Sequence, residues 1–210
     1  LLVAQKKVER CDLFIDFTTM SAQERVMQLL YGQSDTARPL ITGVTGLKES
    51  AQNELLRYAN LAPVFQASNF SIGVALLKRL AALAAESLGD HFDAEIFELH
   101  HRHKLDAPSG TALSLAEAVV RGKQLAGDQR AIVKTEATTP RNSSEVHLSA
   151  GRGGGVFGDH SLFFLGEHER LELKHAAIDR AVFASGALRA AEWCLERPPG
   201  HYQMDHLWDH

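Results

Sequence analysis

The sequence predicts an α/β protein in two parts. The first part has a parallel sheet, and the second is an α+β region with a mixed, mostly antiparallel sheet. Up to residue 88, short apolar runs alternate with helical patterns, which is typical of βαβ units. From residue 131, strand-like segments follow one another with no long helix between them, which favours antiparallel pairing.

The first part begins with a strand followed directly by a helix. Residues 12–17 form a short apolar run that predicts a buried strand. Ser21 and Glu24 form a Ser-x-x-Glu pattern ahead of apolar positions, which predicts a helix that starts with a capping box. Residues 1–10 are weakly patterned and indicate a short helix or the remnant of one.

The strand and helix pattern then repeats. Residues 39–42 and 63–67 predict two more strands, and the residues around 51–59 predict the helix between them. A long apolar helix is expected over residues 72–88.

In the second part, residues 92–99 predict a strand, and a helix follows from about residue 110 to residue 122. Glycine-rich residues 151–155 predict a loop, in which Arg152 can meet an anionic ligand. A helix over residues 181–195 is expected to end before Pro198, leaving a polar tail. Four further segments are expected to be strands: residues 131–134, 145–148, 161–165 and 169–174.

Bulk composition restricts the class of protein. The 210 residues are 45% hydrophobic and 23% charged, which is ordinary for a globular protein. A formal charge of −4 argues against a nucleic-acid surface, and no apolar run has the length of a membrane span. Two cysteines give no disulfide framework, and the N-terminus lacks signal-peptide architecture. We therefore expect a cytoplasmic protein with neither a nucleic-acid partner nor a membrane partner.

Three segments follow the strands of the first part. They are residues 17–18, 43–45 and 67–70. In a parallel sheet the carboxyl ends of the strands share one edge, where ligands bind. Each segment alone is more typical of a turn, but the three together predict a ligand site at this edge.

The densest cluster of chemical groups is residues 98–112, called here the signature segment. It places three histidines, an arginine and a lysine at consecutive positions 100–104 and then turns into a helix. Ser109 is a plausible N-cap, which would leave the backbone N–H groups of Gly110, Thr111 and Ala112 unpaired. A helix N-terminus beside cationic side chains suits a small molecule with carboxylates, and Gly110 lets it approach the backbone.

Two other interpretations of the signature segment stay open. A run of cationic residues is often a solvated loop, and Pro-Ser-Gly-Thr is often only a turn before a helix. Alternatively, His100, His101 and His103 can supply metal ligands. Neighbouring residues of a strand point to opposite faces, however, so we predict no metal site.

The signature segment resembles that of the 4-hydroxy-tetrahydrodipicolinate reductases, a family also called dihydrodipicolinate reductases. Residues 14–18, 43–46, 67–71 and 183–187 resemble other family stretches in the family's order. The resemblance implies a partial Rossmann-type dinucleotide-binding domain formed by residues 1–70 and 178–210. It also implies a substrate-binding and tetramerisation domain over residues 71–177, and a homotetramer.

The resemblance also implies a reaction, namely reduction of a cyclic hydroxylated imine dicarboxylate by NADH or NADPH in lysine and diaminopimelate biosynthesis. It assigns catalysis to His100 and Lys104, with His100 the candidate general acid. Substrate contacts are assigned to His101, Gly110 and Thr111. The implied cofactor-binding residues are Gly43, Val44, Thr45, Ala67, Ser68, Asn69 and Phe70.

The chain departs from the family pattern at its start. Family members begin with a Gly-x-x-Gly-x-Met loop that holds the cofactor pyrophosphate, and no such loop precedes residue 43. We expect the sequence to be a piece of a longer protein. The alternatives are a partner chain that supplies the loop, or a shortened, non-catalytic homologue that binds a dicarboxylate or acts as an oligomeric scaffold. The family's second strand, which selects NADH or NADPH, is also absent.

Overall fold

The chain forms two compact units in the computed structural model, which describes residues 11–32, 37–135 and 140–208. Unit 1 comprises Leu1–Ser71 and Phe183–His210, and unit 2 comprises Ile72–Val182. The helix expected at residues 1–10 lies outside the described residues. Among the described helices, none combines the length and the apolar character that crossing a membrane requires.

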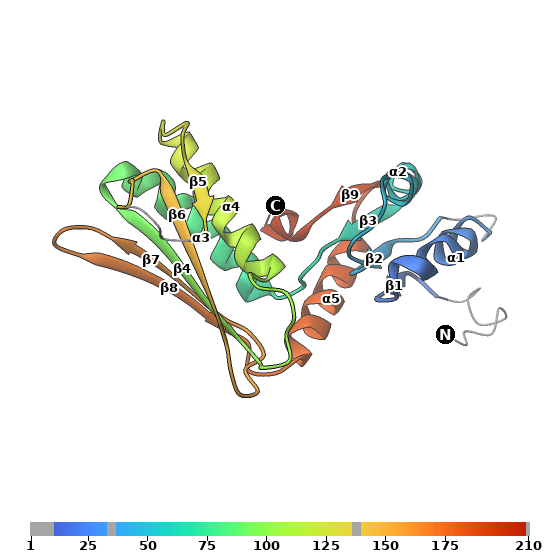
Figure 1. The fold of residues 1–210 in the computed structure, drawn as a ribbon. Helices are drawn as coiled ribbons and strands as arrows, with labels where there is room; N and C mark the ends of the chain where they lie inside the picture. Colours follow the sequence, from blue (N-terminus) through green and yellow to red (C-terminus); the bar gives the residue numbers. More distant parts are fainter. Residues whose placement is uncertain (1–10, 33–36, 136–139, 209–210) are drawn as a thin grey trace. The chain divides into compact units, whose positions relative to one another are not determined.

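Unit 1 contains a parallel four-stranded sheet in the order β1-β2-β3-β9 (Figure 1). The first three strands confirm the predicted parallel sheet. The prediction of a polar tail after Pro198 is wrong, because β9 and a short 3-10 helix, η3 (Met204–Trp208), follow it. No apolar pattern marks β9, which becomes a strand by pairing with the edge of β3. The four strands are β1 (Phe14–Asp16), β2 (Leu40–Thr42), β3 (Pro63–Gln66) and β9 (Gly200–Tyr202).

The helices of unit 1 are α1 (Met20–Tyr31), α2 (Glu49–Tyr58) and α5 (Ala181–Cys194). The predicted capping box of α1 is wrong. Thr19 is the N-cap without a side-chain cap bond, so Ser21 falls inside the first turn, where its hydroxyl lies 2.9 Å from that of Thr19. The apolar faces of α1 and α2 bury Met27 and Leu55 against the sheet residues Leu40 and Val64.

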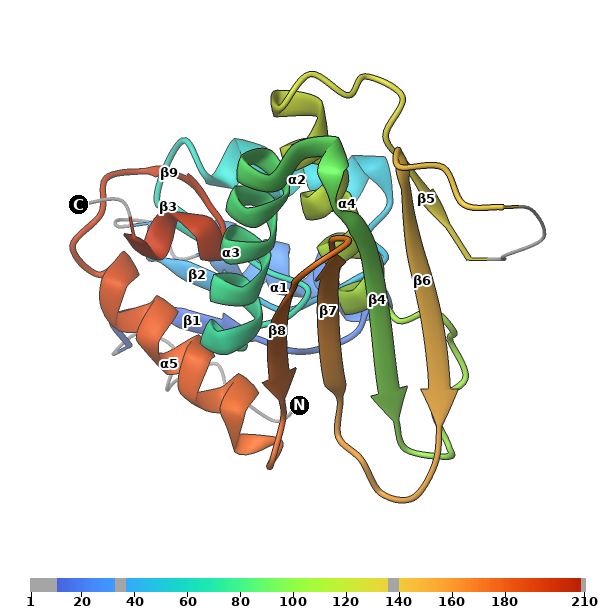
Figure 2. The ribbon, with the colours of Figure 1, turned by 90° about the vertical axis from the view of Figure 1, so that its left-hand side faces the viewer.

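Unit 2 contains a mixed five-stranded sheet in the order β5-β6-β4-β7-β8, seen strand beside strand in Figure 2. The central strand, β4, runs parallel to β6 and antiparallel to β7, which confirms the predicted mixed sheet. β6 is longer than predicted, because Gly151 and Arg152 pair with β4 instead of belonging to the loop. The strands are β4 (Asp93–His100), β5 (Ile132–Lys134), β6 (Glu145–Arg152), β7 (Asp159–Leu165) and β8 (Arg170–Ala176).

Two long helices, α3 (Ile72–Leu88) and α4 (Gly110–Leu125), lie on the same face of this sheet (Figure 1). Their contact is close at Gly122, where a Cβ atom would lie 2.3 Å from the carbonyl oxygen of Ala82. Lys123 is fully buried beside it, and its Nζ donates to three backbone carbonyls at 3.0–3.2 Å. These bonds connect α4 to the 3-10 helix η2 (Gly89–His91), to the start of β4 and to the segment before β6.

Candidate active site

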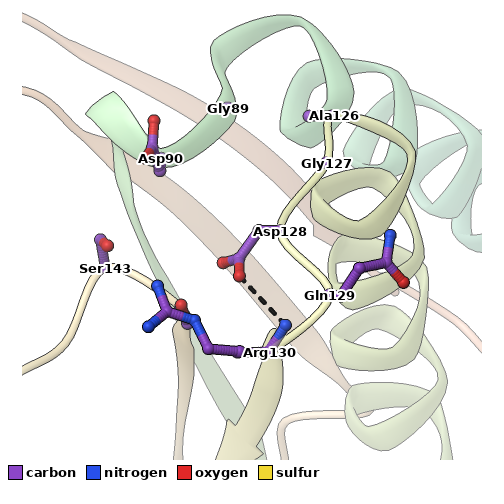
Figure 3. Close-up of a pocket in the computed structure, with 9 residues that line it drawn as sticks. Gly89, Asp90, Ala126, Gly127, Asp128, Gln129, Arg130 and Ser143 are labelled. Atoms are coloured by element: carbon purple, nitrogen blue, oxygen red, sulfur yellow. Dashed lines mark hydrogen bonds between the residues drawn. The ribbon is translucent and has the colours of Figure 1, made fainter.

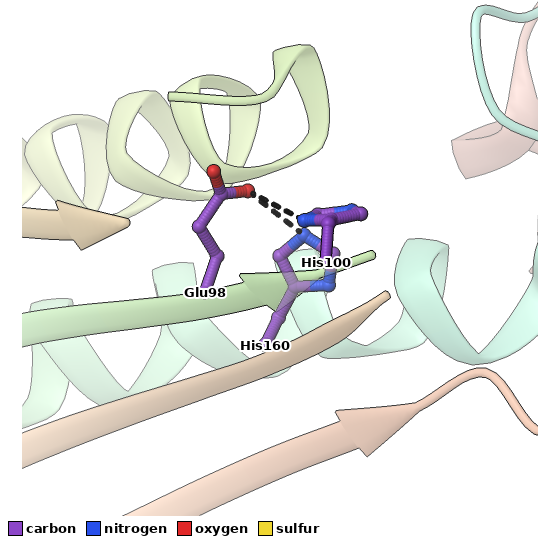
Figure 4. A group of neighbouring side chains, drawn as sticks. All are labelled: Glu98, His100 and His160. Atoms are coloured by element: carbon purple, nitrogen blue, oxygen red, sulfur yellow. Dashed lines mark ion pairs between the residues drawn. The ribbon is translucent and has the colours of Figure 1, made fainter. Parts of the chain in front are cut away.

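The site in unit 2 is built on β4. Side chains alternate between the two faces of a strand, so Glu98 and His100 share the helix-covered face with Ala94 and Ile96. Neighbouring strands bring polar residues to the same place, because His160 of β7 pairs with Glu98. Arg152 of β6 pairs with His100 in the same way. Figure 4 shows Glu98 with both histidine rings beside it.

Glu98 has no exposed side-chain surface, and its carboxylate is held from three directions. Oε1 accepts hydrogen bonds from the backbone N–H of Ser109 and from Nη2 of Arg152, each at 3.0 Å. Oε2 accepts a hydrogen bond from the Ser109 hydroxyl. Burial raises the pKa of Glu98, but the bonds from Ser109 and Arg152 outweigh it and lower the pKa below its usual value, so the carboxylate is ionised.

His100 lies against this carboxylate, with 3.3 Å between its Nδ1 and Oε2 of Glu98. Burial lowers the pKa of His100, and the Glu98 charge opposes that shift. The His160 ring lies 5.3 Å from the His100 ring, centroid to centroid. Burial, reinforced by His100, lowers the pKa of His160 to about 4. At neutral pH His160 therefore adds no charge beside His100.

The signature segment then leads into α4. The predicted N-cap of this helix is confirmed, and one of the predicted unpaired N–H groups is wrong. Ser109 is the N-cap, as predicted, and its hydroxyl accepts a hydrogen bond from the Ala112 N–H at 3.2 Å. That N–H was expected to be unpaired, which is wrong because the cap uses it. Gly110 is exposed, and a Cβ atom there would meet no atom within 4 Å. The space above the first turn of α4 is therefore open.

Between β4 and α4 the signature segment faces solvent. Nζ of Lys104 lies 2.7 Å from Oδ1 of Asp106, and the hydrogen bond from Lys104 lowers the Asp106 pKa. His101 is half-buried, whereas His103 is exposed. The five predicted residues thus separate into the buried His100 and the more accessible His101, Lys104, Gly110 and Thr111.

The predicted metal alternative of His100, His101 and His103 is not the group that the structure brings together. In the part of the chain that the structure describes, the potential ligand atoms of Glu98, His100 and His160 lie within 4.8 Å of one another. This donor set suits a metal ion poorly, because both Glu98 oxygens already accept hydrogen bonds and one of their donors is the cationic Arg152.

The predicted cofactor residues lie at the carboxyl edge of the unit 1 sheet. The backbone N–H of Gly43 donates to the Asp16 carbonyl at 2.9 Å, and that of Ala67 donates to the Thr42 carbonyl at 3.1 Å. These bonds place the segments after β1, β2 and β3 side by side. The Phe17 ring lies 5.1 Å from the Phe70 ring and is 53% exposed. A Cβ atom at position 43 would lie 2.4 Å from the Phe17 ring, so a larger residue there would have to displace this ring.

A cavity of about 400 Å³ lies beside the C-terminal end of α4 (Figure 3). It is polar, and its Asp128 carboxylate accepts a hydrogen bond from the Arg130 N–H at 3.1 Å. None of the residues predicted for catalysis, substrate or cofactor lines it. The chemistry described above is therefore separate from this cavity.

Sequence reasoning missed Glu98 and His160 and treated Arg152 only as a possible ligand contact. The strand alternation that places Glu98 on the face of His100 was available from the sequence. The position of His160 depends on the register between β4 and β7. The two strands are separated by 58 residues along the chain, so the sequence alone does not show which of their residues lie opposite each other.

Comparisons with known proteins agree with this arrangement. The family profile "Dihydrodipicolinate reductase, N-terminus" matches residues 3–70, and "Dihydrodipicolinate reductase, C-terminus" matches residues 73–208. A 4-hydroxy-tetrahydrodipicolinate reductase of Halorhodospira halophila is 43% identical over 198 residues, covering 94% of this chain and 73% of the relative. The protein of the same name from Nitratiruptor sp. is 40% identical over 199 residues, covering 94% of this chain and 77% of the relative.

A solved structure supports the fold. It is the dipicolinate-bound dihydrodipicolinate reductase from Paenisporosarcina sp. TG-14, with a TM-score of 0.72 and 24% identity. The match covers 91% of this chain and 71% of that one. Because the two profiles follow each other along almost the whole sequence and the relatives reach 43% identity, this chain belongs to the dihydrodipicolinate reductase family.

Proposed function

We propose that this chain is a 4-hydroxy-tetrahydrodipicolinate reductase of lysine and diaminopimelate biosynthesis. It reduces 4-hydroxy-2,3,4,5-tetrahydrodipicolinate to tetrahydrodipicolinate, with loss of water, and oxidises NADH or NADPH. The observation that carries the proposal is the signature segment, which joins a buried histidine held by a carboxylate to an open helix N-terminus. The names of relatives about 40% identical to the chain support the same reaction.

Substrate carboxylates are bound at the start of α4. Backbone N–H groups in the first turn of a helix, together with the positive end of its dipole, favour an anion. Gly110 leaves open space there, and Thr111 follows it in the same turn. His101 and Lys104 lie on the accessible part of the signature segment and supply hydrogen-bond donors for a dicarboxylate.

His100 supplies a proton. Hydride addition to a conjugated imine leaves negative charge on the substrate, and a proton must neutralise it. His100 is the candidate donor because histidine exchanges a proton near neutral pH and Glu98 stabilises its charged form. Lys104 is the second catalytic candidate, either as a proton donor or as a charge that holds the substrate.

A pyridine nucleotide, either NADH or NADPH, would supply the hydride when bound. The carboxyl edge of the unit 1 sheet fits such a group because three strand-end segments meet there beside the exposed Phe17 ring. Val44 stands where the family has threonine, which removes a hydroxyl and keeps the backbone groups. The residues that would hold the nucleotide are Gly43, Val44, Thr45, Ala67, Ser68, Asn69 and Phe70.

We also propose a homotetramer that acts in the cytoplasm. The face of the unit 2 sheet opposite α3 and α4 carries Phe97, 43% exposed, and Leu165, 38% exposed. An apolar sheet face of this kind suits a second copy of the chain. Cys11 and Cys194 are both in the thiol form, which suits a reducing compartment.

Nucleotide oxidation is the direct test. The purified protein is mixed with NADH or NADPH, and its substrate is made in the same vessel from pyruvate and aspartate semialdehyde by the pathway's synthase. We expect nucleotide oxidation that depends on the synthase and on both of its substrates. Binding of pyridine-2,6-dicarboxylate without any turnover, in a chain extended upstream by its natural sequence, would instead identify a non-catalytic dicarboxylate-binding homologue.

A further inference from the structure

Glu98 occupies a position that needs a physical explanation. It lies on the face of β4 that Ala94 and Ile96 bury against the helices, and its side chain is fully buried. A carboxylate at such a position is costly unless it is paired and hydrogen-bonded. An apolar residue would fill a core position without that cost, so the charge must serve something other than packing.

The partners of Glu98 show what the charge connects. Ser109 gives it two hydrogen bonds, one from the backbone N–H and one from the hydroxyl, so the carboxylate holds the residue that caps α4. Arg152 contributes a third donor, from the end of β6. One carboxylate thereby joins the central strand, the start of the substrate-binding helix and a neighbouring strand.

The fourth group beside Glu98 is the imidazole of His100. Its Nδ1 lies 3.3 Å from Oε2, and an adjacent anion favours a proton on this nitrogen. The other nitrogen, Nε2, borders Gly158, where a Cβ atom would lie only 2.9 Å away. Glycine therefore keeps Nε2 clear of a side chain, and Nε2 is the nitrogen left to exchange a proton with a bound molecule.

We propose that Glu98 is a positioning residue of the reductase. Its carboxylate orients His100 so that Nε2 delivers the proton, and through Ser109 it holds the start of α4, where the substrate carboxylate binds. A single buried charge thus sets the geometry between the proton donor and the anion-binding helix terminus. This inference rests on the proposed function.

The electrostatic effect of Glu98 has a definite sign. Its negative charge favours the imidazolium form of His100 against burial, which disfavours it. Lys104 and Arg152 also disfavour that form, whereas Asp106 favours it. His160 of β7, whose ring lies 5.3 Å from that of His100, is neutral in the pH range of the alkaline limb. Removing the Glu98 charge while keeping its shape must therefore move the protonation of His100 to lower pH.

The test compares Glu98→Gln with the wild type and with Glu117→Gln, an equal loss of charge on the exposed face of α4. We expect kcat of Glu98→Gln to fall about ten-fold or more. The alkaline limb of its profile of kcat/KM against pH should move about one unit lower. Glu117→Gln should match the wild type. A purely structural role would lower thermal stability but leave the pH profile of the surviving enzyme unchanged, and that result would overturn the proposal.

Ser109→Ala provides a second variant if Glu98→Gln does not fold. It removes the hydroxyl donor from Oε2 and keeps the carboxylate beside His100. Its alkaline limb should stay in place or move to higher pH, while pyridine-2,6-dicarboxylate binding, measured by calorimetry, weakens. A shift to lower pH would contradict the assigned role. A wild-type protein without reductase activity would reject the proposed function itself, whereas an active wild type with an unaltered pH profile in Glu98→Gln would reject only the role of Glu98.

Discussion

Oε2 of Glu98 and Nδ1 of His100 lie 3.3 Å apart. The two residues are separated by one residue, Leu99, on the same strand. The alternation of β4 places both side chains on the same buried face, so the pair is a direct product of strand geometry. The signature segment then returns through Ser109 to the same carboxylate. The proposed proton donor and the proposed anion-binding start of α4 are therefore connected within fifteen consecutive residues.

Replacement of His100 by glutamine should affect chemistry more than binding. We expect kcat to fall about 10²-fold or more, while KM changes little, because the general acid acts mainly in the transition state. Steady-state kinetics measures both constants. The control is His103→Gln in the same cationic run, because His103 is exposed and has no assigned role. Equal losses in kcat and in substrate affinity would mean that His100 only binds.

Gly110→Ala should separate folding from ligand binding. The added methyl group meets no protein atom within 4 Å, so the free energy of unfolding should stay the same or rise slightly. The methyl group would occupy the space above the first turn of α4, and the Kd for pyridine-2,6-dicarboxylate should rise about ten-fold. Calorimetry and thermal unfolding measure the two effects, with Glu117→Ala as the matched helix control. Unchanged affinity in Gly110→Ala would place the dicarboxylate elsewhere.

His160 should make the protein less stable in mild acid. Its pKa is about 4 in the folded chain against 6.5 in the unfolded chain, so the unfolded chain binds more protons between these values. The contribution of His160 to the free energy of unfolding is fully present above pH 6.5. This contribution falls by about 3 kcal/mol as the pH falls towards 4.

Chemical denaturation across this pH range tests the assignment. His160→Gln should remove this part of the pH dependence, whereas His168→Gln, a change of a 94% exposed histidine, should leave it intact. If the free energy of unfolding depended on pH equally in the wild type, His160→Gln and His168→Gln, His160 would not be the responsible group.

Metal removal should leave the activity unchanged. Oε1 of Glu98 already accepts two hydrogen bonds, and the cationic Arg152 donates one of them, so the group of Glu98, His100 and His160 suits a divalent ion poorly. Dialysis against EDTA followed by elemental analysis and the reductase assay tests this expectation. Stoichiometric zinc whose removal abolishes turnover would favour the metal-dependent alternative.

Phe97→Asp should disrupt the proposed tetramer. A charge at this exposed position of the open sheet face would have to be desolvated in an interface between copies. Light scattering coupled to size exclusion should report a smaller species. Leu83→Asp, on an exposed position of α3, should keep the wild-type mass. Identical masses for wild type and Phe97→Asp would remove this face from the interface.

The elements with strong periodicity could be predicted from the sequence. The long apolar run at residues 72–88 coincides with α3, and strands β1 to β8 lie close to the segments predicted for them. β9 could not be predicted, because its three residues owe their conformation to the edge of β3. The capping box failed because Thr19, one residue before the helix, takes the N-cap position instead of Ser21.

Only those features of the candidate site that depend on neighbouring residues in the sequence could be predicted. Ser109 could be assigned as a cap because a serine just before a helical pattern is a local signal. The buried partnership of Glu98 with Arg152 and His160 depends on how β6 and β7 pair with β4. Such register is a property of the whole sheet, so residues far apart in the sequence give no local signal of it.

Unit 1 consists of two segments that lie far apart in the sequence, which affects how the protein folds during its synthesis. Its sheet needs β9, yet the whole of unit 2 lies between β3 and β9 along the chain. A ribosome therefore delivers every residue of unit 2 before the last strand of unit 1 emerges, and domains generally fold as units during synthesis. Until then the outer edge of β3 has no β9 to pair with. Unit 2 can thus complete its fold first, and the free edge of β3 pairs only after residues 200–202 have emerged.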